Sequence, residues 1–486
     1  MAHAHINLRA AVPLAAALLV SACAVGPDYQ RPDLKLTSIY ATPAPTASAQ
    51  PAPIETWWTG FNDPELVRIV ARASAQNLDV QQAAARILQA RAVAKGAGAA
   101  LMPRLDADGQ AASVRQSLLS PIGEIGDHLP GFPRDLDDYQ VGAAASWEID
   151  LFGGLRRQRD AARAEASAAQ ADGAAVRVSV AADAADAYLQ VRAYQARIAV
   201  ARRQERTEQD LVALLNRRTG EGVSPERELH QAQAELEGVR ATIPPLAAGL
   251  ARQLNRLDVL MGAQPGTYRA ELETAAPIPE TPSLSIVEGP ADLLRRRPDV
   301  IAAEQRLVAA NAGIGAAISD YYPKVSVSGL LGFDSVDSSR LFSPLAQASQ
   351  VGAGLRWRLF DFGRVDAEVA QAKGRKAEAL AAYRASVLKA TEDVEDALSD
   401  YGQQQARADA LARQIGELTT ARNQSQQAFE GGVISLVEVR DADRDLLTAS
   451  DQLVQAKAGA ARAAVAAYRA LGGGWSPVSA ERVAAR

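Results

Sequence analysis

The side chains that could carry out acid–base or metal chemistry are few and scattered in this sequence. Four histidines occur among the 486 residues, His3, His5, His128 and His230, and no two of them have the spacing of metal ligands. No glycine-rich loop that could cradle a phosphate and no Ser/His pair accompanies them. The sequence therefore predicts no catalytic residue, no metal site and no cofactor. His128 and His230 are expected on the surface, and His3 and His5 are expected to leave with an export signal. An enzyme is the rival class, and it would require a hydrolytic activity that is lost when His230 is substituted.

The single cysteine, Cys23, has a context that points to lipid chemistry. Arg9 precedes the apolar run 10–20, and small residues stand directly before Cys23. A positive residue, a short apolar stretch and small residues form an export signal, and this run is shorter than the ~20 residues of a transmembrane helix. The context resembles a bacterial lipobox, in which the thiol is acylated and begins the mature chain. Ala24, where an aspartate would favour inner-membrane retention, implies sorting to the outer membrane. The alternative is an ordinary signal peptide with a chance cysteine.

Composition favours closely packed helices and argues against a nucleic-acid binder. Apolar residues make up 48% of the chain, but aromatic residues make up 5% and alanine dominates. The 52 basic and 57 acidic side chains give a formal net charge of −5. A protein that binds nucleic acid would be expected to carry a basic patch or domain, so we expect no nucleic-acid partner.

An internal duplication organises the chain. Two constant offsets relate its halves: 220 for Asp79 and Asp299, and 210 for Trp147 and Trp357. The ten-residue difference falls in one variable loop per copy, because register is kept on either side of it. These loops are predicted at residues 116–138 and 334–350. The predicted segments are a signal peptide (1–22), a lipid-anchored segment (23–63), repeat 1 (64–262), a Pro-rich connector (263–290), repeat 2 (291–472) and a disordered tail (473–486).

Each copy has two strand-like segments around its loop. Apolar and polar side chains alternate from 139 to 151, with Glu148 and Asp150 in the polar row, and again from 351 to 359, with Arg356 and Arg358. A soluble sheet with one wet face is the alternative. Strands that cross a bilayer must close into a barrel. Eight strands leave an interior filled by side chains, so three chains with four strands each are the smallest assembly with a lumen. The four polar residues are predicted to line it.

Very long helices follow the strands. No helix breaker interrupts residues 154–220, and the second copy runs similarly from 364 to 431. Roughly 65 residues make a helix of about 100 Å. Apolar residues recur at the spacing of four and three that is typical of a coiled-coil seam. Shorter helices are expected at 224–261 and 435–471, the first interrupted at Pro244-Pro245. A soluble scaffolding coiled coil is the alternative, but it does not explain the strands inserted in both halves.

Nearly all of the mature chain resembles the TolC-like outer-membrane efflux channels, specifically the efflux lipoproteins of the NodT type. The motifs that carry the resemblance are Cys23-Ala-Val-Gly-Pro-Asp-Tyr-Gln-Arg-Pro32, Leu294-Arg-Arg-Arg-Pro-Asp-Val300, Ala303-Glu-Gln-Arg-Leu307, Tyr322-Pro323, Leu359-Phe-Asp-Phe-Gly363 and Leu471-Gly-Gly-Gly-Trp475. The resemblance implies a mixed α and β fold in which a homotrimer forms a 12-stranded transmembrane β-barrel, continued by a periplasmic α-helical barrel. It also implies a periplasmic adaptor protein and an inner-membrane transporter as partners.

The resemblance implies a gate at the periplasmic tip, in the segment from Phe429 to Asp441. Glu438 and Asp441 are three residues apart on one helix face, and in a trimer each would form a ring of carboxylates that favours cations. Glu228 is the counterpart of Glu438 in the first copy. The hypothesis is that contacts among four residues hold the tip closed: Phe429, Glu228, Glu438 and Asp441. Phe429 lacks the hydroxyl of the tyrosine that the family often has there.

These features together predict a lipid-anchored outer-membrane subunit of a tripartite efflux pump, which passes drugs or other small molecules to the outside. Two alternatives stay open. One is a channel for type I protein secretion, and the other is a structural envelope lipoprotein that does not conduct.

Overall fold

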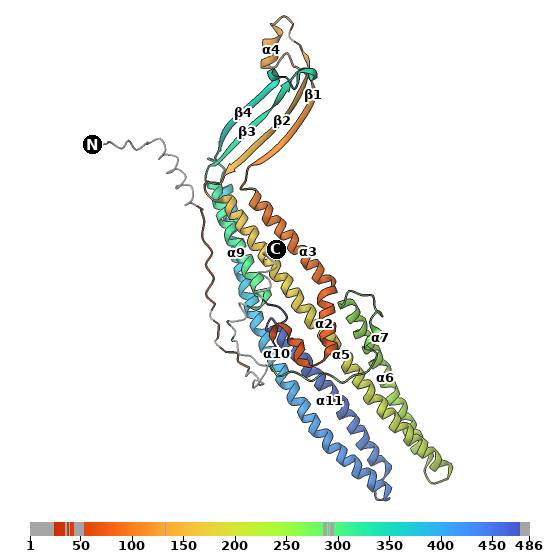
Figure 1. The fold of residues 1–486 in the computed structure, drawn as a ribbon. Coiled ribbons are helices and arrows are strands. Elements are labelled where there is room, and N and C mark those ends of the chain that lie inside the picture. The colour runs from red at the N-terminus through yellow and green to blue at the C-terminus, as the bar shows by residue number, and fades with distance from the viewer. Residues whose placement is uncertain are drawn as a thin grey trace, which may run out of the picture. The chain divides into compact units, whose positions relative to one another are not determined.

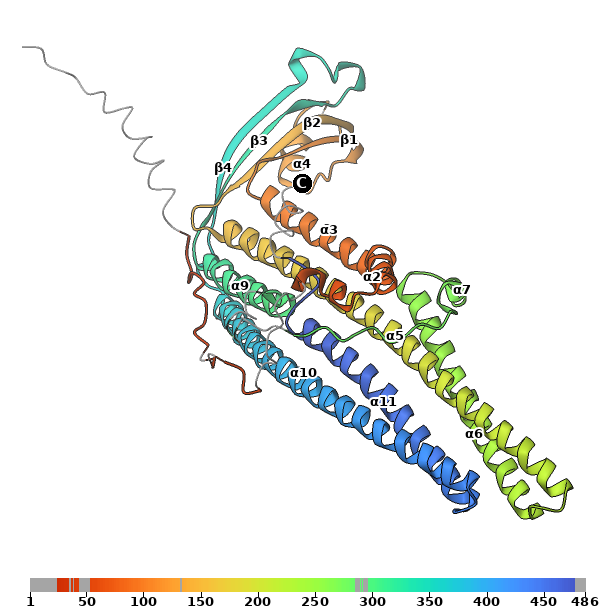
Figure 2. The same cartoon turned by 60° about the horizontal axis from the view of Figure 1, so that its bottom comes forward.

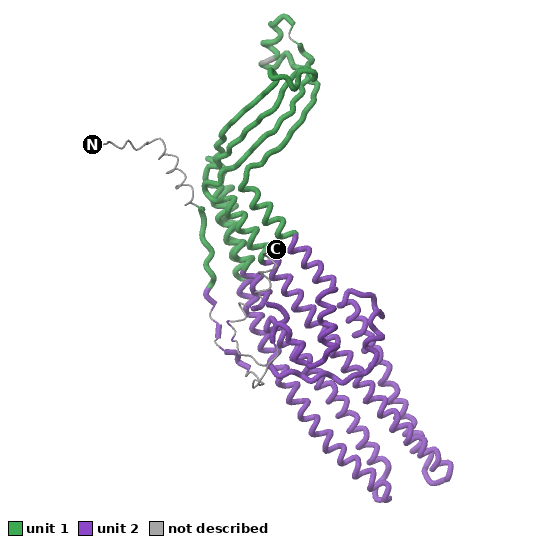
Figure 3. The backbone as a smooth tube through the Cα atoms, viewed as in Figure 1, with its two compact units in different colours: residues 1–32, 89–167, 305–381 green, residues 33–88, 168–304, 382–486 purple. Residues whose placement is uncertain are grey.

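The computed structural model describes residues 24–34, 36–37, 39–42, 53–131, 133–284, 289, 291 and 296–476. The predicted signal peptide, Cys23 and residues 477–486 of the predicted tail lie outside this range. The chain divides into two compact units, which Figure 3 colours separately. Unit 1 consists of residues 1–32, 89–167 and 305–381, and unit 2 of residues 33–88, 168–304 and 382–486.

Unit 1 contains one four-stranded antiparallel sheet in the order β1-β2-β3-β4 (Figure 1). The strands are β1 (Arg104–Arg115), β2 (Asp135–Ile149), β3 (Lys324–Ser335) and β4 (Gln347–Arg356). The loop between β1 and β2 contains the short helix α4 (Pro121–Asp127), and the loop between β3 and β4 contains the 3-10 turns η3 (Ser338–Arg340) and η4 (Pro344–Ala346). Both loops are shorter than predicted because the strands extend further into them.

The N-terminal segment, residues 24–32, is attached to the helices of unit 1. The Val25 N–H donates to the Phe152 carbonyl (3.0 Å), and Arg157 Nη2 donates to Asp28 Oδ1 (2.9 Å). Gly26 has φ +97°, and a Cβ there would lie 2.4 Å from the Cα of Gly315. The approach of two backbones therefore requires glycine at these positions.

Helices make up most of the rest of the chain (Figure 1, Figure 2). Two hairpins stand out, α5–α6 and α10–α11, whose turns lie in unit 2. The helices are α2 (Pro64–Gln76), α3 (Leu78–Ala99), α5 (Gly154–Gly220), α6 (Glu226–Leu260), α7 (Arg269–Leu272), α9 (Pro298–Ile318), α10 (Arg364–Glu430) and α11 (Leu436–Ala470), with 3-10 segments η1 (Ile54–Phe61) and η2 (Ser319–Tyr321). Among the described residues, no helix is both long enough and apolar enough to cross a membrane.

The long helices and the first strand of each copy begin at the predicted offsets. Helices α5 and α10 each have 67 residues and begin 210 positions apart, and α6 and α11 each have 35 residues with the same offset. Strands β1 and β3 each have 12 residues and begin 220 positions apart. Even the positive φ angles return, at Gly222 (73°) and Gly432 (72°) in the hairpin turns.

The predicted break at Pro244-Pro245 is wrong, because α6 runs through both prolines as one helix. A proline inside a helix removes one backbone hydrogen bond and typically costs ~3 kcal/mol. Both prolines are exposed, so water can satisfy the freed carbonyl groups. Packing further along α6, where Leu254 and Leu257 are buried, keeps the helix continuous.

The core of unit 2 follows the predicted seam. On α5, Ala184, Ala187 and Val191 have no exposed surface. On α10, Val394 and Tyr401 are 1% exposed. Small alanines at these positions let helix axes approach closely, which is why so few aromatic residues suffice to fill the core.

Candidate functional site

The two faces of the sheet have opposite character. Residues directly opposite each other in an antiparallel pair point to the same side, so the register defines each face across all four strands. One face carries mainly polar side chains: Arg104, Asp106, Asp108, Gln110, Gln140, Ser146, Glu148, Lys324, Ser326, Ser328, Asp334, Gln350 and Arg356. The other carries mainly apolar side chains: Leu105, Ala107, Ala111, Val141, Ala143, Ala145, Val325, Val327, Leu331, Phe333, Val351, Ala353 and Leu355.

The apolar face is open in the single chain. Leu105 is 73% exposed, Leu331 59%, Val351 86% and Leu355 68%. Monomeric soluble proteins rarely expose a contiguous apolar patch of this kind, and such a patch marks a membrane or protein contact. Leu330, on the otherwise polar face, is an exception to the pattern and is 44% exposed.

Two of the four predicted lumen residues lie on the polar face within strands, and two do not. Glu148 and Arg356 are strand residues. Asp150 follows the end of β2, and its carboxylate accepts hydrogen bonds from the backbone N–H groups of Leu155 (3.0 Å) and Arg156 (2.9 Å). It therefore caps the start of α5, where a negative charge is favourable. Including Asp150 in the strand was wrong, since the alternating pattern continued past the end of the strand.

Arg358 likewise lies beyond β4. Its Nη1 pairs with Glu368 Oε2 at 3.3 Å, and its Nη2 lies 4.0 Å from Asp320 Oδ2. Its assignment to the strand was also wrong, because the β4 ladder ends at Arg356. Nearby, the Tyr321 hydroxyl donates to Asp366.

The hairpin turns at the ends of α5 and α10 are built alike. Gly222 and Gly432 have positive φ angles. The Val223 N–H donates to the Arg218 carbonyl (2.8 Å), and the Val433 N–H donates to the Ala428 carbonyl (2.9 Å). This is the Schellman pattern that ends a helix. Val223 (61%) and Val433 (79%) are exposed at the apex of the turns.

The predicted gate residues all lie at these turns, but the structure does not join them to one another within one chain. Glu438 accepts a hydrogen bond from Ser435 Oγ (3.4 Å), and Asp441 pairs with Arg444 (3.2 Å). The Phe429 ring lies 6.0 Å from the Arg218 guanidinium. Among the described residues, no hydrogen bond or ion pair links Glu228, Glu438 and Asp441.

Ion pairs between helices are the polar contacts that sequence reasoning missed. Arg440 on α11 pairs with Glu235 on α6 (Nε to Oε2 2.9 Å). Arg422 on α10 pairs with Asp443 on α11 (2.8 Å). Glu208 on α5 is 5% exposed, and its Oε1 accepts from Gln204 (2.7 Å). Burial is the main reason that the pKa of Glu208 is raised. The partners in the two ion pairs lie on different helices, so no spacing in the sequence indicates these two contacts, whereas Gln204 and Glu208 are four residues apart on one helix.

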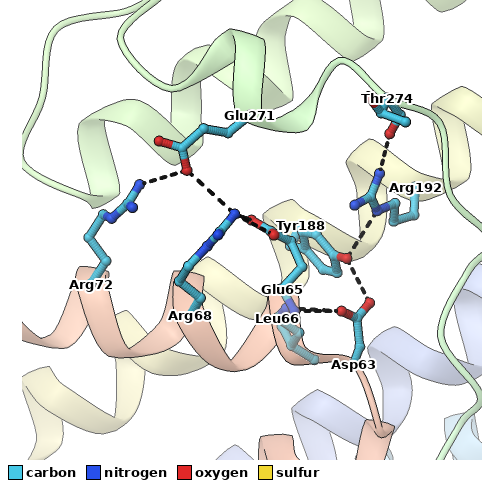
Figure 4. Close-up of polar contacts among 9 residues, drawn as sticks. All are labelled: Asp63, Glu65, Leu66, Arg68, Arg72, Tyr188, Arg192, Glu271 and Thr274. Atoms are coloured by element: carbon cyan, nitrogen blue, oxygen red, sulfur yellow. Dashed lines mark hydrogen bonds and ion pairs between the residues drawn. The ribbon is translucent and has the colours of Figure 1, made fainter.

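A polar cluster fastens α2 to α5 (Figure 4). Asp63 caps α2, because its Oδ1 accepts from the N–H groups of Glu65 (2.9 Å) and Leu66 (3.2 Å). The Tyr188 hydroxyl on α5 donates to Asp63 Oδ2 (2.6 Å) and accepts from Arg192 Nε (3.0 Å). Burial, followed by donation to Asp63, raises the pKa of Tyr188, so its hydroxyl stays protonated at neutral pH.

The same region is tied to the segment after α7. Arg192 Nη1 donates to the Thr274 carbonyl (2.8 Å). Glu271 lies between Arg72 (3.3 Å) and Arg68 (3.5 Å), as Figure 4 shows. In the part of the chain that the structure describes, no group of three or more His, Cys, Asp or Glu side chains could hold a metal ion.

Comparison with known proteins decides the family. A sequence profile of the outer membrane efflux protein family matches residues 69–263 and again residues 289–473. The chain belongs to the outer membrane efflux protein family. The two matches correspond to the two copies of the duplication, and the predicted resemblance is thereby confirmed.

Individual relatives of this family cover nearly the whole chain. The pyoverdine export outer membrane protein OpmQ of Pseudomonas putida is 32% identical over 445 residues, which cover 90% of this chain and 92% of OpmQ. Nodulation protein T of Rhizobium leguminosarum is 27% identical, covering 95% and 97%. The solved structure of the outer-membrane channel OprN is 34% identical, with a TM-score of 0.83 and coverage of 94% and 100%. The chain is therefore an outer-membrane protein of the efflux type, a family of channels and not of enzymes.

Proposed function

We propose that three copies of this chain form a channel through the outer membrane, which serves as the exit duct of a tripartite efflux pump. The observation that carries the proposal is the sheet with one polar and one exposed apolar face. Its apolar side chains suit lipid and its polar side chains suit a water-filled lumen. In the described chain, β1 and β4 each pair with one strand only, so closure needs further copies.

Three copies are the smallest number that leaves a lumen. Twelve strands exceed the eight whose interior is filled by side chains. Glu148 and Arg356, on the polar face, would then border the water-filled space. The hairpins α5–α6 and α10–α11 would continue the duct into the periplasm and meet the adaptor protein and the inner-membrane transporter. The transporter would select the small molecules that pass.

We further propose that the hairpin turns form the gate. Exposed carboxylates at Glu438 and Asp441 would form rings around a threefold axis, and such rings favour cations at a constriction. The turn regions have little core to hold them in place: in residues 431–448, Val439 is the buried side chain. In α11 from Ala456 onward, by contrast, most side chains are buried.

The lipid anchor on Cys23 is part of the proposal. The N-terminal segment that follows it is held to unit 1 by Arg157 and by the contact between Gly26 and Gly315. The described segment that begins at Ala24 would thus link the lipid anchor to unit 1. Cys23→Ser should abolish incorporation of palmitate while leaving the protein in the membrane through its barrel.

Planar-bilayer recording of the purified protein tests the channel. The wild type should give discrete conductance steps, and Glu438→Ala with Asp441→Ala should change the conductance and lower the preference for cations. Glu430→Ala, an exposed carboxylate near the same turn, controls for loss of charge alone. No conductance from a protein that is trimeric in detergent would refute the channel and favour the structural lipoprotein. An unchanged current in the double variant would refute the gate.

A further inference from the structure

The duplication relates strand pairs as well as single residues. Adding 220 to each β1 residue and 210 to its β2 partner should give the partners of β3 and β4. The pair Arg104–Ser146 becomes Lys324–Arg356, and this pair is observed. The side-chain contacts of the two hairpins repeat as well: Trp147 Nε1 donates to the carbonyl of residue 101, and Trp357 Nε1 to that of residue 321, both at 3.0 Å. The offsets therefore predict register correctly where it can be checked.

The pairing between the two hairpins, β2 with β3, occurs once in the chain. Its register joins Ala143 to Leu331 and Gly142 to Gly332. The edges of β1 and β4 have no strand partner among the described residues. A ring built from these hairpins has no unpaired edge, so β4 of one copy has to pair with β1 of the next copy. Because the two hairpins are repeats, the β2–β3 pairing is the pattern for that β4–β1 pairing.

We infer that β4 pairs with β1 of a second copy in a register fixed by the duplication, an inference that rests on the proposed trimer. Adding 210 to a β2 residue and subtracting 220 from its β3 partner turns Ala143–Leu331 into Ala353–Ala111. The same operation places Gly352 opposite residue 112 of the second copy. The repeat offsets are even, so each face keeps its character across the seam between the copies.

This register brings opposite charges together at the seam. Arg356 stands opposite Asp108 of the second copy, both on the polar face. Each is exposed, and neither makes an ion pair within 4.0 Å to any residue described in the single chain. Opposite charges directly across an antiparallel pair stabilise it. A register shifted by two residues would place Arg356 opposite neutral Gln110, or opposite Asp106, whose carboxylate already pairs with Arg104 (2.6 Å).

The junction below the strands gives a second, independent indication. Within the chain, Phe152 stacks on Tyr322 with ring centroids 4.6 Å apart. The counterpart of Phe152 is Phe362, which is fully exposed and has φ +54°, a backbone conformation that is unusual for a bulky residue. The counterpart of Tyr322 is Met102, which is 68% exposed. The same step places Phe362 on Met102 of the second copy, a favourable contact between sulfur and an aromatic ring.

Disulfide trapping in a Cys23→Ser background tests the register. Ala353→Cys with Ala111→Cys should form covalent oligomers up to trimers that reductant reverses. Ala353→Cys with Ser113→Cys is two residues off register and should form covalent oligomers at least about tenfold less. Diagonal neighbours lie about 7–8 Å apart, whereas a disulfide needs Cα atoms closer than ~7 Å. The matched control is Ala143→Cys with Leu331→Cys, the equivalent pair inside one chain. It should form a disulfide within the chain and no covalent oligomer.

Charge reversal is a second measurement that does not depend on cysteine oxidation. Asp108→Arg should lower the temperature at which the trimer dissociates, and Asp108→Arg with Arg356→Asp should restore it. Additive losses in the double variant, or trapping at the off-register pair in a trimeric protein, would overturn the register and leave the proposed channel standing. A protein that is monomeric by light scattering in every variant, wild type included, would instead overturn the channel proposal itself.

Discussion

Substitution of Tyr188 by phenylalanine removes a single oxygen from the centre of the cluster in Figure 4. The hydroxyl donates to Asp63 at 2.6 Å and accepts from Arg192 at 3.0 Å. The ring still fills its site, which has no exposed surface, so packing is kept. What is lost is the link between the capping residue of α2 and α5. We therefore expect α2 to open locally more often.

The size of the effect follows from the charges of the two partners. Hydrogen bonds to charged groups are each worth about 1.5–3 kcal/mol. Asp63 retains its two bonds to the α2 backbone, and Arg192 retains those to Gln195 and Thr274. Because these groups stay partly satisfied, we expect a loss of about 2–4 kcal/mol in the free energy of opening α2. This corresponds to a roughly 30-fold to 700-fold increase in opening.

Hydrogen exchange followed by mass spectrometry measures this opening on peptides from α2 in the detergent-solubilised protein. Tyr401→Phe is the matched control, since its buried hydroxyl bonds to neutral partners, the Pro282 carbonyl (3.0 Å) and Gln405 (2.6 Å). A neutral hydrogen bond contributes only about 1 kcal/mol, so the loss of these two should raise exchange near Tyr401 by at most about 30-fold. If Tyr188→Phe changed exchange in α2 no more than Tyr401→Phe changes its own surroundings, the argument from charged partners would be refuted.

Three further predictions concern single positions. Burial raises the pKa of Glu208, so ionisation of this side chain disfavours the fold. The local stability of α5 should therefore rise as the pH falls from neutral through this raised pKa. Glu208→Gln should remove that pH dependence, measured as hydrogen-exchange protection factors corrected for intrinsic exchange. Gly315→Ala places a Cβ 2.8 Å from a backbone oxygen of the N-terminal segment, whereas Gly313→Ala meets nothing within 4 Å. The first should release residues 24–32 to proteolysis, and the second should not. Gly432→Ala, at φ +72°, should cost about 1–2 kcal/mol and speed exchange in the hairpin turn, while Gly431→Ala, whose Cβ would make ordinary contacts, should cost less.

Much of the fold could be predicted from sequence because its elements repeat at constant spacing. The offsets of 210 and 220 related the helices and strands of the two copies, and the alternation of polar and apolar side chains predicted the two faces of the sheet. Strand ends were less predictable, because Asp150 continues the polar alternation but is drawn to the free N–H groups of α5. The prolines of α6 show the converse case, in which packing overrides a strong local signal.

The sequence located the hairpin turns that carry the proposed gate residues, but not the contacts around them. Glycine turns and carboxylates three residues apart locate the tip, but Arg440 and Glu235 are brought together only by folding. Nothing in the local sequence of either residue indicates the other. Among the described residues of one chain, no hydrogen bond or ion pair links Glu228, Glu438 and Asp441, so the proposed latch would have to form between neighbouring copies.

The kind of interaction changes along the helices of unit 2, and this bears on how a gate could move. Towards the end of α11, Ala456, Ala461 and Ala464 have no exposed surface, and the Trp57 ring stacks on Tyr468 at 5.4 Å. Such packing is dense and costly to disrupt. Towards the hairpin turns, buried apolar side chains are fewer, and ion pairs such as Arg440–Glu235 join the helices; Arg440 is 11% and Glu235 51% exposed. An ion pair that water reaches from one side contributes less than the dense packing of alanines, so we expect these ends to separate at smaller cost than the packed ends. Segments that move in function are drawn from such weakly held regions.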